Sequence, residues 1–294
     1  MLKVAMLSGW HVHAHEYAQR LRARADVQLT AVWGEEGGNG EAFAKELNLP
    51  YEPCLDTLLA RPDVDAVCVN TPTNLHRDVM VKAANAGKHI FTEKVLAPTA
   101  AECADIRTAI EKAGVKFCIS FPHRTFPRNL FAKQVVSDGL LGDITYMRVR
   151  NAHDGAIANW LPAYFYNKEQ CGGGAMMDLG AHPMYLTAWL MGKPACISSA
   201  FTYVTGREVE DNAVCVMKYP SGAIAVTETG FTSAASPNTL ELHGTAGTLT
   251  ITDDAIRLHS RKLEGGLGGW VTQPRLPKAL PDPITQCVEG VLHD

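Results

Sequence analysis

Short apolar runs and helix-like segments alternate along the first 120 residues, and this alternation restricts the possible folds more than any other feature of the sequence. The runs that read as buried strands lie at 3–7, 28–33, 66–69, 89–92 and 116–120, with a shorter one near Tyr51. Segments with helical spacing separate them at 13–25, 41–47, 55–60, 76–86 and 100–113. Helical crossovers join parallel strands, because a tight hairpin cannot. The sequence therefore predicts an α/β fold that begins with a doubly wound parallel sheet.

The regular alternation of strand and helix patterns ends after Pro122. A helix is predicted at 175–191, and alternating strand-like segments lie at 144–150, 200–204, 213–219, 223–229, 239–243, 248–252 and 256–260. The turns Pro220 to Gly222 and Asp253 to Asp254 separate some of them, and 261–283 is expected to be a long irregular loop. We therefore expect two domains, 1–122 and 123–294. The second is an α+β domain whose open, largely antiparallel sheet either exposes an apolar face for dimerisation or buries it within the subunit.

Composition excludes several classes of protein. The 294 residues are 46% hydrophobic and 20% charged with a net charge of −4, which suits a packed globular protein and gives no basic surface for nucleic acid. The apolar runs fall short of the roughly 20 residues of a membrane span, and the N-terminus shows no signal-peptide pattern. The eight cysteines form no CxxC pair and are expected to be reduced. We expect a cytoplasmic protein.

The turn after the first strand departs from the glycine pattern G-x-G-x-x-G of dinucleotide sites. Its residues are Gly9, Trp10, His11, Val12, His13 and Ala14, so one glycine remains and a small residue replaces the third. The His11 ring can donate a hydrogen bond to phosphates, and the helix N-terminus favours an anion there. The segment is interpreted either as a phosphate-binding turn or as a polar helix start.

Histidines also alternate at His11, His13 and His15. A metal site is not expected there, because positions i and i+2 diverge on a helix and no cysteine or acidic ligand adjoins them.

Acidic residues follow the second strand. Glu35 and Glu36 lie where an acid often binds the ribose hydroxyls, although both are equally consistent with solvated loop charges. Between Gly34 and Ala44 there are three glutamates and no Lys or Arg. A 2′-phosphate would have no positive partner there, so NAD is favoured over NADP.

Three ordered motifs carry a resemblance to a known family. They are Asn70 to His76 (NTPTNLH), Ala86 to Lys94 (AGKHIFTEK) and Gly172 to His182 (GGGAMMDLGAH). The sequence resembles the Gfo/Idh/MocA oxidoreductases, the family of glucose-fructose oxidoreductase and inositol dehydrogenase.

The resemblance implies a Rossmann domain that binds a nicotinamide dinucleotide and a second domain that holds a sugar, cyclitol or related polyol. It places the family's catalytic residues on Lys94, Asp178 and His182. Its cofactor loop falls on Asn70, Thr71, Pro72, Asn74, His76, Glu93 and Lys94, in addition to Gly9, Trp10, His11, Val12 and Glu35 from the turns described above. The family usually has Pro after the lysine, where this chain has Val95, so the geometry of that turn stays open.

The chemistry of an alcohol dehydrogenase suits these residues. Oxidation of a secondary hydroxyl needs a hydride acceptor and a base for the proton. Asp178 and His182 have i, i+4 spacing, so on one helix the carboxylate would orient the imidazole, and His182 is the expected base. Lys94 is expected to hydrogen-bond the reacting oxygen. Candidate substrate residues are Lys94, Arg124, His153, Asp154, Asn159, Trp160, Tyr164, Asp178 and His182.

We therefore expect an NAD-dependent oxidoreductase that transfers hydride between the nicotinamide and a secondary hydroxyl of a sugar, cyclitol or polyol. Two alternatives remain: an NAD-assisted, redox-neutral glycoside hydrolase or lyase, and a nicotinamide-binding regulator without turnover. A homo-oligomer, dimer or tetramer, is expected through the C-terminal sheet. The helical pattern that starts at Ile284 stops at Asp294, so the second domain is expected to be either naturally short or without its final helices.

Overall fold

A computed structural model describes residues 1–263 and 270–293, and the chain divides into two compact units. The first unit contains Met1–Ser120, Glu169–Gly172 and Pro281–Asp294, and the second contains Phe121–Lys168 and Gly173–Leu280. This division differs from the predicted one in three segments: residues 121–122 belong to the second unit, and 169–172 and 281–294 group with the N-terminal unit. Of the predicted loop 261–283, residues 264–269 lie outside the described residues.

The first unit is built on a five-stranded sheet with the order β2-β1-β3-β4-β5, in which every pair is parallel. The strands are β1 (Leu2–Leu7), β2 (Val27–Trp33), β3 (Ala66–Val69), β4 (His89–Thr92) and β5 (Phe117–Ile119). The helices are α1 (Ala14–Arg22), α2 (Gly40–Glu46), α3 (Leu55–Ala60), α4 (His76–Asn85), α5 (Ala100–Ala113) and α9 (Pro283–His293), with the 3₁₀ turn η1 (Thr73–Leu75). The predicted doubly wound sheet is confirmed, and Tyr51 makes only an isolated bridge to Val32.

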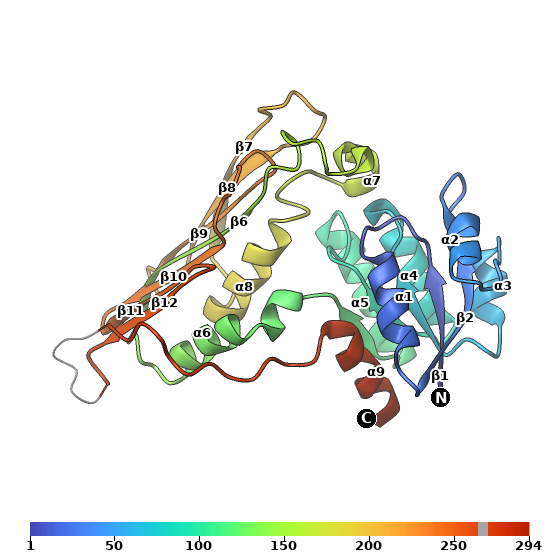
Figure 1. The fold of residues 1–294 in the computed structure, drawn as a ribbon, viewed down its shortest axis with the longest axis horizontal. Helices are drawn as coiled ribbons and strands as arrows, with labels where there is room; N and C mark the ends of the chain where they lie inside the picture. The colour runs from blue at the N-terminus through green and yellow to red at the C-terminus, as the bar shows by residue number, and fades with distance from the viewer. Residues whose placement is uncertain (264–269, 294) are drawn as a thin grey trace. The chain divides into compact units, whose positions relative to one another are not determined.

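Helices cover both faces of this sheet, because its strands are apolar on both sides (Figure 1). Along β1, Val4 and Met6 join the core under α1, α2 and α9, whereas Ala5 and Leu7 join the core under α3, α4 and α5. A capping box starts α5: the Thr99 hydroxyl accepts the Glu102 N–H, and the Glu102 carboxylate accepts the Thr99 N–H. Such a rigid sheet holds the loops at its carboxyl edge in defined positions.

The second unit is built on a seven-stranded sheet with the order β12-β11-β10-β6-β9-β8-β7. Its strands are β6 (Ile144–Ala152), β7 (Cys196–Thr202), β8 (Asn212–Lys218), β9 (Ile224–Gly230), β10 (Thr239–Gly244), β11 (Gly247–Ile251) and β12 (Ile256–Ser260). Its helical segments are η2 (Pro122–Thr125), α6 (Pro127–Ser137), η3 (Ala163–Tyr166) and α8 (Ala181–Met191), and α7 (Lys168–Cys171) lies at the division between the units. The largely antiparallel character is confirmed, with one parallel pair, β6 and β9.

One face of this sheet packs under α6 and α8, and the other face is open (Figure 1). In β8, Ala213, Cys215 and Met217 are buried, while the residues between them face the other side. The open face is not simply apolar. Ion pairs join β6, β9 and β10 across it through Arg148, Glu228, Glu241 and Arg150. Val216 of β8 and Ile224 of β9 are exposed apolar side chains of this open face. Ile197 and Phe201 of β7 are exposed as well, but they pair with Met217 and Ala213 and so lie on the other face of the sheet.

Two predicted elements need correction, and one helix was not predicted. The helix expected at 175–191 begins only at Ala181, because turns occupy the glycine-rich segment before it. Helix α6 was missed, and β7 starts at Cys196, four residues earlier than predicted. All eight cysteines are free thiols, of which Cys54 and Cys196 are exposed.

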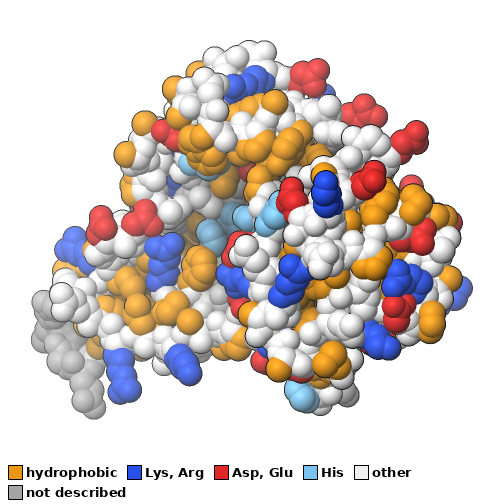
Figure 2. All heavy atoms as spheres, turned by 45° about the vertical axis from the view of Figure 1, so that its right-hand side comes forward, with side chains coloured by type: hydrophobic (Ala, Val, Ile, Leu, Met, Phe, Trp, Pro, Cys, Tyr) orange, Lys and Arg blue, Asp and Glu red, His pale blue; other side chains and the backbone are white. Residues whose placement is uncertain are grey.

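Acidic and basic side chains are interspersed over the surface that Figure 2 shows, in keeping with the small net charge. Among the described residues, no helix combines the length and the apolarity that crossing a membrane requires.

Candidate functional site

The carboxyl edge of the first sheet gathers the loops that the sequence analysis singled out. Backbone hydrogen bonds tie these loops together: His11 donates to the Asn70 carbonyl at 3.1 Å, and Asn70 donates to the Leu7 carbonyl at 2.9 Å. Glu93 likewise donates to the Val69 carbonyl at 3.2 Å. The ends of β1, β3 and β4 therefore meet at one edge, where ligands of doubly wound sheets bind.

The turn after β1 is tight even without the full glycine pattern. A Cβ on Gly9 would lie 2.7 Å from Cγ of Phe43, so only glycine fits there. Ser8 adopts the left-handed conformation, with φ of 71°, that a glycine would otherwise supply. Helix α1 then starts at Ala14, so that Trp10 to His13 form the loop in front of its N-terminus.

Buried acceptor oxygens around this edge fit a dinucleotide. Among the described residues, Oε2 of Glu35, Oγ1 of Thr71 and Oδ1 of Asn74 are shielded from solvent and have no hydrogen-bond partner. Buried polar atoms are normally paired, so these oxygens are suited to a ligand rich in hydroxyl and amide donors. Glu35 follows β2, where a ribose hydroxyl would be expected.

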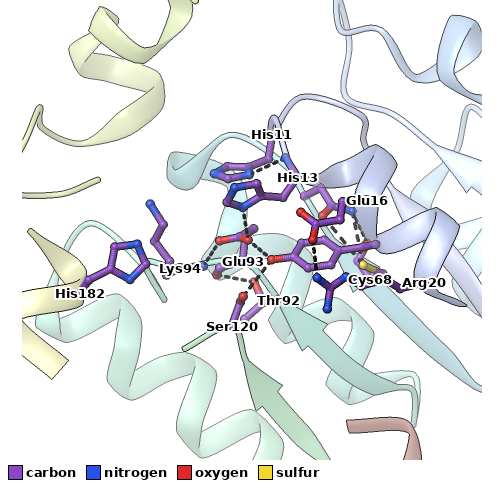
Figure 3. A network of polar contacts seen from close by, with 12 residues as sticks. His11, His13, Glu16, Arg20, Cys68, Thr92, Glu93, Lys94, Ser120 and His182 are labelled. Atoms are coloured by element: carbon purple, nitrogen blue, oxygen red, sulfur yellow. Dashed lines mark hydrogen bonds and ion pairs between the residues drawn. The ribbon is translucent and has the colours of Figure 1, made fainter. Parts of the chain in front are cut away.

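Glu93 is the centre of a buried polar network (Figure 3). Its side chain is 1% exposed, and its Oε1 lies 2.8 Å from Nδ1 of His13 and accepts the Tyr17 hydroxyl. Its Oε2 accepts the backbone N–H of Lys94 at 2.8 Å. Oη of Tyr17 also lies 2.8 Å from Oγ of Ser120.

The network determines which of its groups are charged. Burial alone would raise the pKa of Glu93, but the positive charge of His11, His13 and Lys94 outweighs it and holds that pKa far below its usual range. For His13, burial lowers the pKa, and the contact with Glu93 more than compensates, so it is raised. Burial, followed by the charge of Glu93, raises the pKa of Tyr17, which keeps its proton.

His76 connects two loops of the predicted cofactor site. Its Nδ1 lies 2.8 Å from the Val95 carbonyl and its Nε2 lies 3.2 Å from the Thr71 carbonyl. The ring is buried, and burial lowers its pKa, so it is held neutral. The peptide bond between Lys94 and Val95 is cis, and Lys94 itself is 7% exposed. His76 therefore positions the turn that carries Lys94.

His182, in the second unit, is held by aromatic and hydroxyl groups. Its Nδ1 lies 2.8 Å from the Tyr185 hydroxyl, and its ring stacks on His123 with centroids 4.2 Å apart and planes 12° apart. The Tyr185 oxygen also accepts the backbone N–H of His123 at 3.0 Å. The orientation of this imidazole is thus set within the second unit.

The predicted placement of Asp178 and His182 on one helix face is wrong. Asp178 lies in the turns before α8, where its N–H donates to the Gly174 carbonyl at 3.0 Å. These turns are held by buried Glu210, whose carboxylate accepts the N–H groups of Gly174 and Met176. A Cβ on Gly174 would lie 2.0 Å from the Glu210 carbonyl oxygen, which explains the glycine.

The candidate substrate residues separate into groups. His153 stacks on Phe231 and contacts Trp160, whose Nε1 donates to Asp154 at 3.0 Å. Trp160 is 56% exposed, so this group offers an aromatic surface beside polar atoms. Two other candidates have structural partners: the Arg124 guanidinium lies over the Trp189 ring, and Asn159 accepts from Arg207. Tyr164 packs beside the core of Phe165 and Phe231.

The sequence did not predict several residues that contact Glu93 or His182. Tyr185 follows His182 by three positions on α8, a spacing that could have identified it. No local sequence pattern predicts the other contacts, because the partners are far apart in sequence and only the folded chain brings them together. These contacts are Tyr17 with Glu93, His123 with His182, and Glu210 with the glycine-rich turn.

A parallel sheet with buried acceptor atoms at its carboxyl edge and a second unit with an ordered histidine are the features expected of a two-domain nucleotide-dependent oxidoreductase. Comparison with known families agrees. The family model described as the oxidoreductase family with an NAD-binding Rossmann fold matches residues 4–121, and the GFO/IDH/MocA C-terminal domain matches residues 130–250. The chain belongs to the GFO/IDH/MocA family, and its first unit is that family's NAD-binding Rossmann domain.

Individual relatives are distant. The chain is 26% identical over 226 residues to 1,5-anhydro-D-fructose reductase of Ensifer adhaerens, which covers 76% of this chain and 67% of the relative. It is 27% identical over 246 residues to 2,7-anhydro-N-acetylneuraminate hydratase of Escherichia coli, covering 80% and 64%. The matched part thus spans about two thirds of these relatives. A levoglucosan dehydrogenase solved with NADH and levoglucosan shares the fold, with a TM-score of 0.81, 20% identity and coverage of 99% and 88%.

Proposed function

We propose that the protein oxidises a secondary hydroxyl of a sugar, cyclitol or related polyol, or reduces the corresponding ketone, with NAD as the hydride carrier. Membership of an oxidoreductase family supports the reaction class, and relatives named for anhydrosugar substrates support the substrate class. The observation that carries the proposal furthest is the ordered imidazole of His182, held by Tyr185 and stacked on His123. A side chain of this type is the usual general base of alcohol oxidation.

The proposed division of labour follows from the local geometry. Nicotinamide, when bound, supplies the hydride acceptor. His182 takes the hydroxyl proton at Nε2, while its Nδ1–H donates to the Tyr185 oxygen and so stabilises the imidazolium that forms. Lys94 hydrogen-bonds the reacting oxygen, and Asp178 is proposed to bind substrate beside it. The cofactor residues are those of the carboxyl edge, with Glu35 on the ribose and Asn70 to Asn74 and His76 along the loop after β3.

Glu93 is expected in the cofactor loop, and we propose that it also positions the Lys94 turn. Its carboxylate contacts His13, Tyr17 and the Lys94 backbone. The His153, Asp154 and Trp160 group is proposed as an outer part of the substrate site.

A redox-neutral reaction is the second candidate, because one relative is named a hydratase. In such a reaction the carrier is regenerated within each turnover, so no net NADH accumulates.

The test is a screen of sugars, anhydrosugars, inositols and sugar acids with NAD⁺, followed by absorbance at 340 nm and by product analysis. A dehydrogenase accumulates NADH in proportion to the ketone product, whereas a redox-neutral enzyme forms product without NADH. His182→Ala is expected to lower kcat by about 10³-fold, which is within the range of a lost general base. Lys94→Ala is expected to lower kcat by about 10²- to 10³-fold, as the loss of a hydrogen-bond donor to the reacting oxygen does. Unchanged turnover of a verified substrate in both variants would refute the assignment.

A further inference from the structure

Three potential metal ligands lie close together at the carboxyl edge of the first sheet. His11 and His13 come from the loop after β1, and Glu93 comes from the end of β4, 80 residues away in sequence from His13. Each side chain offers one ligand atom, and these atoms all lie within 4.8 Å of one another. The two imidazole rings are 4.9 Å apart between centroids (Figure 3).

Both sequence-based reasons against a metal here fail in the structure. His11 and His13 do not sit on a helix, since α1 begins at Ala14, and the loop turns both rings to the same side. An acidic ligand is present as well, because the parallel pairing of β1, β3 and β4 brings Glu93 to the same edge.

We propose that His11, His13 and Glu93 bind one divalent transition-metal ion of the zinc class. Two imidazoles and one carboxylate form a donor set that such ions use with an open fourth position for water or another ligand. Ideal bonds of about 2.0 to 2.2 Å place tetrahedral ligand atoms roughly 3.3 Å apart. The distance of 2.8 Å between Nδ1 of His13 and Oε1 of Glu93 is shorter than this ideal spacing, and the upper limit of 4.8 Å among the three ligand atoms is longer. A small side-chain rotation therefore brings the three atoms to the spacing that an ion needs.

The surroundings permit that rotation and support the carboxylate. The His13 side chain is 43% exposed, so core packing does not fix its rotamer. Glu93 is buried, and the Tyr17 hydroxyl and the Lys94 N–H hold it in place as outer hydrogen-bond donors. Binding replaces the His13–Glu93 contact and the 3.2 Å hydrogen bond from the His13 N–H to Nδ1 of His11. The ammonium charge of Lys94 opposes the ion, which predicts moderate rather than extreme affinity.

The same segment contains a matched control. His15 belongs to the same alternating run, but it is exposed and its Nε2 lies 2.7 Å from Glu46, outside the cluster. A general affinity of histidines for metal would depend on His15 as much as on His13.

The experiment is a titration of the chelator-treated full-length protein with Zn²⁺ by calorimetry and with Co²⁺ by visible absorption, without cofactor or substrate. We expect one ion per chain. His13→Ala and Glu93→Gln should each weaken binding at least 10-fold and abolish the Co²⁺ spectrum of a site with imidazole ligands, while His15→Ala should leave both unchanged.

Circular dichroism and the Tm establish that each variant is folded. Because Glu93 is buried, Glu93→Gln can destabilise the fold. If that variant is unfolded, the binding measured for His13→Ala, at a half-exposed position, tests the proposal. Lack of stoichiometric binding to the parent protein would overturn the proposal. So would equal binding by the parent, His13→Ala and His15→Ala. Since no turnover is measured, these results are independent of the proposed dehydrogenase activity.

Discussion

At the scale of single residues, the proposed base owes its orientation to a neighbour on its own helix. The Tyr185 oxygen accepts the His123 N–H and lies 2.8 Å from Nδ1 of His182, so it connects η2 with α8 around the imidazole. In the proposed mechanism this hydroxyl accepts the Nδ1–H of His182 and orients the ring, which is the part that a carboxylate plays in many other active sites.

Tyr185→Phe tests this role. The ring and its packing stay, but the acceptor for Nδ1–H is lost, so kcat should fall about 10-fold, in line with roughly 1.4 kcal/mol for one hydrogen bond. The Kd for NADH should be unchanged, whereas the Tm should fall slightly, because the His123 N–H loses the same acceptor. Steady-state kinetics together with NADH fluorescence titration measure both. A rise in KM with constant kcat would instead indicate a substrate-binding role.

Cofactor choice is also a residue-scale property. Glu35 keeps one buried carboxylate oxygen without a partner, and no Lys or Arg lies between Gly34 and Ala44. Glu35→Ser removes the charge that would repel a 2′-phosphate, so NADP⁺ should bind about 10-fold more tightly relative to NAD⁺ than in the parent. Calorimetric Kd values for both nucleotides measure the ratio, with Glu41→Ser on the exposed side of α2 as the control. Tighter binding of NADP⁺ than of NAD⁺ by the parent protein would contradict the charge argument.

At the scale of elements, the second sheet is held together by charge as well as by apolar packing. On its open face, Arg148 binds Glu228 at 2.7 Å and Glu241 at 3.2 Å, and Arg150 binds Glu228 at 3.3 Å, so one network spans β6, β9 and β10. The hydrogen bond from Arg148 lowers the pKa of Glu228, more than burial raises it.

The pH dependence of Glu228→Gln follows from this shift. A carboxylate with a lowered folded-state pKa stabilises the fold fully above its unfolded value, near 4.5, and this contribution is lost as pH falls through the folded value. At pH 7 the variant should lose about 1–2 kcal/mol, because Glu228 is half-buried and hydrogen-bonded to a charged group. Thermal unfolding should therefore show a lower Tm than the parent at pH 7 and a smaller difference at pH 4. A difference independent of pH would assign the effect to packing.

At the scale of the whole molecule, the edge strand β7 of the second sheet is a candidate contact surface between subunits. Every residue of β7 is exposed, with the large apolar side chains of Ile197 and Phe201, and exposed Tyr203 and Val204 follow directly after the strand. An exposed strand edge with apolar side chains favours association with a second copy. The predicted homo-oligomer is thus proposed to form through this edge of the C-terminal sheet.

Phe201→Glu tests the association. The side chain is 46% exposed, so the variant should fold normally, while a charge at the contact should shift a dimer or tetramer toward the monomer. Analytical ultracentrifugation at several concentrations measures the state, and Lys45→Glu on exposed α2 controls for added negative charge. A monomeric parent protein would rule out the proposal.

The quality of the sequence-based predictions varied with the kind of signal. Elements with strong local patterns were predicted closely: β3, β4 and α5 have the expected bounds, and the capping box of Thr99 is present. Elements with weaker local patterns were predicted wrongly or not at all. The apolar run from Ala175 continued a helical period through residues that form turns, because Glu210 holds the backbone of Gly174 and Met176 in another conformation. Helix α6 was missed next to Pro127, which starts it.

By itself, the sequence determined the alternation of strands and helices, the division into a parallel and a largely antiparallel sheet, and the family to which the chain belongs. These properties depend on local periodicity and short motifs. Only the tertiary structure decided which side chains meet. It paired Glu93 with His13 and Tyr17, placed His123 against His182, took Asp178 off the helix and packed α9 on the first sheet. The reason is physical: strand order and sheet pairing, which local sequence does not encode, bring residues tens of positions apart to within hydrogen-bonding distance.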